Sequence, residues 1–152
     1  MMKIKKILIV VSLLSLVVSN LSADNFNWKK TEEFKTLSEF KTVEDFEKYY
    51  EVYIQNCLDN RKTDIQGIKC MIGDDLWDRE LNIYYKKIMA KLNTEDKKNL
   101  KQSQQSWLKM RDLTFKLNLN IIVKNYPNDG TMYRLMGSHD LMHLESYTIK
   151  ER

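Results

Sequence analysis

Two histidines, His139 and His143, have the spacing of a metal site. They lie in the sequence HDLMH, and histidines at i and i+4 on a helix can bind one metal ion. In the metalloprotease form of this motif a glutamate follows the first histidine, whereas here Asp140 does. A catalytic zinc ion needs three protein ligands, and no histidine follows His143. We therefore expect two surface histidines, with no metal site and no cofactor.

Polar and aromatic residues form a second set, in the blocks WDRELNIYY and QQSWLKMRD. A spacing of three or four residues puts three of them on one helix face in each block: Asp78, Asn82 and Tyr85, then Gln104, Trp107 and Arg111. One interpretation is a polar cleft that binds a carboxylate. We favour a buried network that fixes the register of two helices, because Asp–Arg and Asn–Gln pairs satisfy buried polar groups. No Ser–His or Cys–His pair able to act in nucleophilic catalysis stands beside these residues, so we do not expect an enzyme.

Two long helices must position these blocks. Apolar residues recur at helical spacing over residues 63–92 and again over residues 94–124. Thr63 opens the first helix with a capping box, and Thr94 opens the second. Because the break between the helices is so short, they should form an antiparallel hairpin.

In this hairpin Arg111 should reach Asp78 or Asp75. We expect the ion pair to be substantially buried beneath Trp107 and Tyr85. On the same register, Asn82 should face Gln104 and Gln105.

Two further helices complete the expected fold. One runs from Thr42 to about Cys57, and the last begins at Thr131 after the turn NYPNDG. One proline and four glycines are too few for a fold rich in turns. The sequence therefore predicts an all-α domain, a small bundle of about four helices built on the long hairpin.

The two cysteines predict one disulfide. An even number of cysteines in an exported chain favours a disulfide, and Cys57 can pair only with Cys70. The spacing does not fit a redox-active CxxC site.

The beginning of the chain has the three parts of a secretory signal peptide. Three lysines precede an apolar core over residues 7–18, which is short for a membrane span, and Ala23 ends an acceptable cleavage site. The alternative is an uncleaved membrane anchor. We favour cleavage after residue 23, followed by a polar leader over residues 24–41. The protein should then be periplasmic or secreted, with no stable insertion in the membrane.

The charge of the mature chain excludes some classes of partner. The precursor has 25 basic and 21 acidic residues, and removal of the three lysines of residues 1–23 leaves 22 basic residues, a net charge of +1. A nearly neutral chain provides no bulk electrostatic attraction for nucleic acid or for an anionic membrane.

The ordered motifs resemble those of a known family. A C-x12-C pair is followed by D-x-x-L-N-x-x-Y and then by Q-x-x-W-x-x-x-R-D. This set resembles the lysozyme-inhibitor LprI-like family of exported bacterial helical proteins, with a domain over residues 42–152. The motif residues are Asp78, Leu81, Asn82, Tyr85, Gln104, Trp107, Arg111 and Asp112. Members often have a second cysteine pair, which Phe115 and Asp140 replace here, so the last helix should be less firmly anchored.

The resemblance implies a binding protein. Its partner would be a lysozyme or another cell-wall hydrolase, which the protein would occlude. The acidic run over residues 44–47 and the pair Asp74 and Asp75 could act locally on a basic lysozyme. The alternative is an envelope accessory or immunity protein that binds another secreted protein through its tyrosine-rich first helix, without inhibiting lysozyme.

Overall fold

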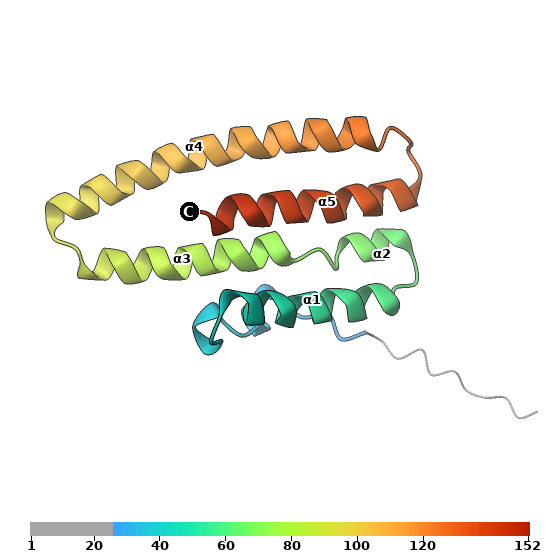
Figure 1. The fold of residues 1–152 in the computed structure, drawn as a ribbon, viewed down its shortest axis with the longest axis horizontal. Coiled ribbons are helices and arrows are strands. Elements are labelled where there is room, and N and C mark those ends of the chain that lie inside the picture. Colours follow the sequence, from blue (N-terminus) through green and yellow to red (C-terminus); the bar gives the residue numbers. More distant parts are fainter. Residues whose placement is uncertain (1–25) are drawn as a thin grey trace, which may run out of the picture.

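The structure, a computed structural model, describes residues 26–152 and is all-α over that range. The expected fold class is confirmed. Two short 3-10 turns precede five helices (Figure 1): α1 Val43–Asp59, α2 Asp64–Ile68, α3 Gly73–Lys91, α4 Thr94–Asn125 and α5 Thr131–Lys150. The predicted signal peptide lies outside the described residues. None of the described helices is long and apolar enough to cross a membrane.

Side-chain caps begin three of the helices. Thr42 accepts a hydrogen bond from the Asp45 amide at the start of α1, and Thr63 accepts one from the Gln66 amide at the start of α2. The cap of α4 is Asn93, whose side chain accepts from the Asp96 amide, so the expected cap Thr94 is instead the first helical residue. Because these caps are local, the sequence could place the helix starts to within one residue.

The helix expected over residues 63–92 is in fact two helices, so that prediction was wrong. Residues 69–72 separate α2 from α3. Within this break the disulfide holds Cys70, and Gly73 then begins α3 against α5. A Cβ atom at Gly73 would lie 3.1 Å from Ser146 Oγ and 3.2 Å from Met142 Sδ. The chain is therefore bent by long-range contacts that helical periodicity does not report.

Helix α5 is the centre of the fold. It packs against α2, α3 and α4, and Figure 1 shows it between α3 and α4. Its buried residues face these neighbours: Leu135, Gly137, Met142, Ser146 and Ile149. The last helix thus has buried contacts with three neighbours, and its weaker anchoring without the second family disulfide stays a prediction. The hairpin is also open, because α3 and α4 diverge from their connection to admit α5.

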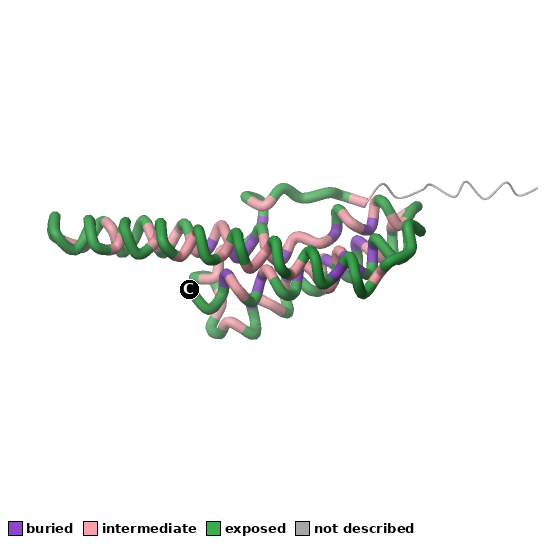
Figure 2. Tube along the Cα trace, turned by 90° about the horizontal axis from the view of Figure 1, so that it is seen from above, coloured by how far each residue is buried: buried purple, intermediate pink, exposed green. Residues whose placement is uncertain are grey.

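The core lies away from the connection between α3 and α4. Phe46, Leu76 and Met142 are among its most buried residues. From Leu81 to Ile121 no residue is buried, and Figure 2 shows the end of the hairpin around the connection between α3 and α4 projecting beyond the core. The projecting end therefore offers its side chains to the surroundings.

The segment over residues 26–41, expected as a polar leader, packs on α1 and α3. Phe34 is only 4% exposed, and its ring meets the ring of Tyr53 edge to face with centroids 4.8 Å apart. The Tyr53 hydroxyl also accepts a hydrogen bond from the Lys29 amide. The aromatic face of α1 is therefore largely occupied by packing within the chain.

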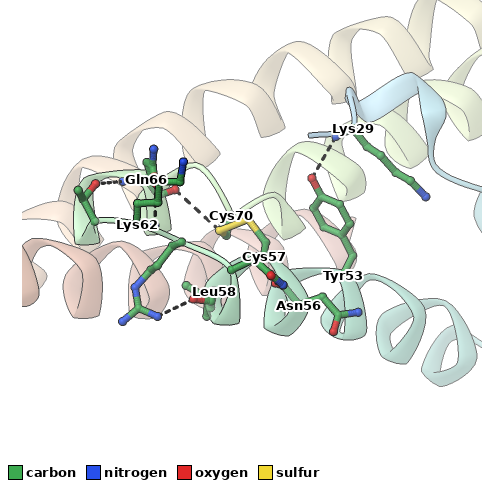
Figure 3. The surroundings of a disulfide bond; sticks show 11 residues. Lys29, Tyr53, Asn56, Cys57, Leu58, Lys62, Gln66 and Cys70 are labelled. Atoms are coloured by element: carbon green, nitrogen blue, oxygen red, sulfur yellow. Dashed lines mark hydrogen bonds between the residues drawn. A yellow bond between two sulfur atoms is a disulfide. The ribbon is translucent and has the colours of Figure 1, made fainter. Parts of the chain in front are cut away.

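The predicted disulfide is confirmed. Cys57 near the end of α1 is joined to Cys70 in the break between α2 and α3, with Cα atoms 5.7 Å apart (Figure 3). Both cysteines are almost completely buried. The bond fixes α1 to the start of the helical pair that carries the motif blocks.

Reduction should therefore lower the stability of the mature protein. Closure of a loop of this length constrains the unfolded chain by about 3 kcal/mol. Urea unfolding with and without reductant should differ by about 2–4 kcal/mol. These are the only cysteines of the chain, so reductant acts on one bond. An unchanged unfolding midpoint, with reduction verified by thiol titration, would contradict the structural role of the disulfide.

Candidate functional site

The four motif residues of α3 and Gln104 of α4 line hollows between the two arms near the C-terminal end of α5, whereas Trp107, Arg111 and Asp112 line neither hollow. Two hollows lie there, one of about 440 Å³ and one of about 270 Å³. Leu81, Tyr85 and Gln104 line both of them. Two motif blocks about twenty residues apart in sequence are thus brought to one place by the turn of the hairpin.

The larger hollow is mainly apolar. Apolar and aromatic side chains from both arms of the hairpin form much of its wall, among them Trp77, Leu81, Tyr84, Ile88 and Leu100. Lys150 and Arg152, at the end of α5, stand at the same hollow. Arg152 donates to Gln104 Oε1 at 3.2 Å and thereby ties the end of the chain to α4.

Arg111 lies opposite Asp78, as the register predicted. Arg111 Nη1 is 3.3 Å from Asp78 Oδ1, and Nη2 is 2.8 Å from the carboxylate of the neighbouring Asp112. Asn82 donates to Asp78 Oδ2 at 3.0 Å, within its own helix. It makes no hydrogen bond to Gln104, so the expected Asn–Gln pair does not form.

The expectation that this ion pair is substantially buried was wrong. The side chain of Asp78 is 45% exposed and that of Arg111 is 21% exposed. The guanidinium lies 5.5 Å from the ring centroids of both Trp107 and Phe115, one turn away on each side. Since α5 separates α3 from α4, the pair spans the opening at its surface and is not enclosed by the two helices.

Among residues 26–152 the most buried ion pair is that of Arg79 with Glu80, which the sequence analysis did not predict. Their side chains are 15% and 2% exposed, and Arg79 Nη2 lies 2.7 Å from Glu80 Oε1. Arg79 also donates to the main-chain carbonyls of Thr31, Phe34 and Lys35 at 2.6–2.9 Å. Adjacent helix residues do not normally face each other. The one available signal was that Glu80 lies one turn after Leu76 on the apolar face.

Three carboxylates gather where α3 begins beside α5. Burial raises the pKa of Glu145 from its ordinary value of 4.5 to about 7, and the negative charge of Asp74 acts in the same direction. Burial and the charge of Asp75 likewise raise the pKa of Asp74. Arg111 opposes the shift at Glu145 without cancelling it. We call Asp74, Asp75, Asp78 and Glu145 the acidic cluster.

The two arginines should differ in their contribution to stability. Arg79→Met leaves a buried carboxylate without its partner and three carbonyls without a donor, at a cost of about 3–5 kcal/mol. Arg111→Met removes a partly exposed pair and two ring contacts, at a cost of about 1–2 kcal/mol. Urea unfolding of both variants beside the wild type measures the difference. A larger loss for Arg111→Met would contradict this assignment of the buried pair.

Glu145 should make the protein less stable as pH rises. A carboxyl group whose folded-state pKa is raised holds its proton better in the folded state, so its stabilisation is present below about pH 4.5 and is lost as pH rises through about 7. Glu145→Gln should therefore raise the free energy of unfolding at pH 8 and flatten its decline between pH 5 and 8. Glu95→Gln, an exposed carboxylate on α4, is the matched control. Equal pH profiles for wild type and Glu145→Gln would refute the shift.

Comparison with known proteins supports the motif-based resemblance. No curated protein and no solved structure matched the chain. A family model described as lysozyme inhibitor LprI matches residues 57–151, which is more than half of the chain and includes both cysteines, the two motif blocks and all of α5. The protein therefore belongs to the lysozyme inhibitor LprI family.

Proposed function

We propose that this protein is an exported binding protein that occludes a lysozyme or another cell-wall hydrolase. The observation that carries the proposal is the family match over residues 57–151. The disulfide is consistent with an oxidising compartment. Both cysteines form that bond, so residues 26–152 contain no free thiol for nucleophilic catalysis. Binding and not catalysis is therefore the activity we expect.

The acidic cluster is the surface we assign to the partner. Lysozymes are typically basic, and a complementary acidic surface accelerates and orients such an association. Besides burial, the negative charge of Asp74 raises the pKa of Glu145, and that of Asp75 raises the pKa of Asp74, so like charges repel within the cluster of the free protein. A cationic side chain placed between them would relieve that repulsion. A basic partner should therefore bind favourably at the acidic cluster, even though the whole mature chain is nearly neutral.

The smaller hollow extends this surface. Asp78 belongs to the acidic cluster and also lines the hollow of about 270 Å³, together with Tyr85 and Leu108. An aromatic or apolar side chain of a partner would find contact area there, next to the charges that attract it. Such combinations of a desolvated pocket and a polar surround are typical of the strongest parts of protein interfaces.

Purified mature protein should inhibit at least one basic lysozyme and elute with it from a sizing column. The double variant Asp75→Asn/Glu145→Gln should bind at least ten-fold more weakly, a loss of about 1.4 kcal/mol. The control double variant Glu95→Gln/Asp129→Asn removes the same number of carboxyl groups elsewhere and should bind like the wild type. Added salt should weaken the wild-type complex more than that of the acidic-cluster variant.

Three other outcomes are informative. Co-elution without inhibition would favour the accessory or immunity protein over the inhibitor. Equal weakening by both double variants would show that only net charge matters and would remove the acidic cluster from the interface. Absence of both inhibition and co-elution across a panel of lysozymes would refute the proposal.

A further inference from the structure

The two histidine rings on α5 meet at their outer nitrogens. His139 Nε2 and His143 Nε2 are 3.2 Å apart, and the rings are inclined at 68° to each other. Two nitrogens bound at about 2.0–2.1 Å to one tetrahedral metal ion lie about 3.3 Å apart. The same separation fits a hydrogen bond between the rings in the metal-free protein. The two arrangements are compatible, because a metal ion would replace the shared proton.

The surroundings of His139 favour the form that binds metal through Nε2. Asp140 Oδ1 lies 3.5 Å from His139 Nδ1, and Tyr126 donates to Asp140 Oδ2 at 2.6 Å. A carboxylate beside one ring nitrogen favours the proton there and leaves the other nitrogen free as a ligand, an arrangement common around protein metal sites. Tyr126 holds that carboxylate in place from the end of α4.

Methionine sulfur stands on the same face of the helix. Met132 and Met136 precede the histidines at i, i+4, i+7 and i+11, so all four side chains follow one stripe of α5. Met132 and Met136 are 54% and 42% exposed. Both line one hollow with His139 and with Met71 from the break before α3. The stripe thus combines imidazole with thioether groups that solvent can reach.

We propose that His139 and His143 bind one copper ion through their Nε2 atoms, with the Met136 thioether as a third donor to Cu(I). Thioether and imidazole ligands together select copper, and copper also stands highest in the affinity order of divalent metals. The sequence alone predicted no metal site here, and the separation of the two ring nitrogens is the observation that points to one. No group of three His, Cys, Asp or Glu residues able to hold a metal occurs among residues 26–152. The site is therefore a binding site open to solvent.

This site is separate from the surface assigned to the hydrolase. It involves none of the motif residues and none of the acidic cluster.

The test is a titration of untagged mature protein with Cu(I), held reduced by ascorbate, in competition with a chromogenic Cu(I) chelator. Mass spectrometry should verify that the disulfide stays intact, since free thiols would bind copper themselves. We expect one ion per chain. His139→Gln and His143→Gln should each lower the Cu(I) affinity at least ten-fold. The double variant should bind Cu(I) about as weakly as the weaker of the two single variants, because neither histidine suffices alone.

Sulfur is tested separately. Met136→Leu should weaken Cu(I) binding at least three-fold and leave Ni²⁺ binding unchanged, whereas Met110→Leu, an exposed methionine on α4, should alter neither. The chain has no other histidines, so two imidazole signals in the proton NMR spectrum should shift together on addition of Ni²⁺ or Zn²⁺.

Two results would overturn the proposal. One is Cu(I) affinity that is the same in wild type and in the double histidine variant. The other is a pair of imidazole signals that stay unmoved at saturating metal. Loss of binding in the histidine variants with full binding in Met136→Leu would support the histidine site and refute the sulfur ligand. Circular dichroism of each variant checks that α5 still forms, and because the substituted side chains are exposed, folding should be preserved.

Discussion

The whole arrangement depends on how closely α5 approaches its neighbours. Three of the four glycines of the chain lie at those contacts. A Cβ atom at Gly67 would lie 2.9 Å from Leu135 Cδ1, and one at Gly137 would lie 3.0 Å from Ile122 Cγ2. Gly73 makes the equivalent contact with Met142 and Ser146. Because the glycines on α2, α3 and α5 carry no side chain, the last helix can lie deep between the others. In that position it holds the hairpin open.

Local signals in the sequence were sufficient for most of the helix starts and for the disulfide. Thr42 and Thr63 begin helices by bonds to residues three positions away, and Cys57 had a single possible partner. The break before Gly73 could not be predicted in this way, since it follows from contact with α5 about seventy residues later. Helical periodicity describes which residues face a core, but it does not say which helix supplies that core.

The site was predicted in its register but not in its environment. Arg111 and Asp78 face each other because the short turn fixes the hairpin, and that could be counted along the chain. Their exposure depends on the spacing of the two arms, which α5 sets. Arg79 illustrates the same limit, because its main partners are main-chain carbonyl groups of residues 31–35. Every residue has such a carbonyl, so the sequence does not indicate which of them accept a hydrogen bond. The Arg79 charge is paired inside the fold, whereas in the acidic cluster Asp75 is exposed and Asp78 partly exposed.

The absence of buried residues from Leu81 to Ile121 has a consequence for the motions of this protein. A segment with few buried apolar contacts opens at a smaller free-energy cost than the core, so its amide hydrogens exchange through local opening and not through global unfolding. The arms of α3 and α4 near their connection should therefore form a cooperative unit of their own. A partner seated between them would order that unit, and some of the binding energy would be spent on conformational entropy. The part of the molecule that is held by α5 and the disulfide is already ordered, so partner binding would not change its conformational entropy.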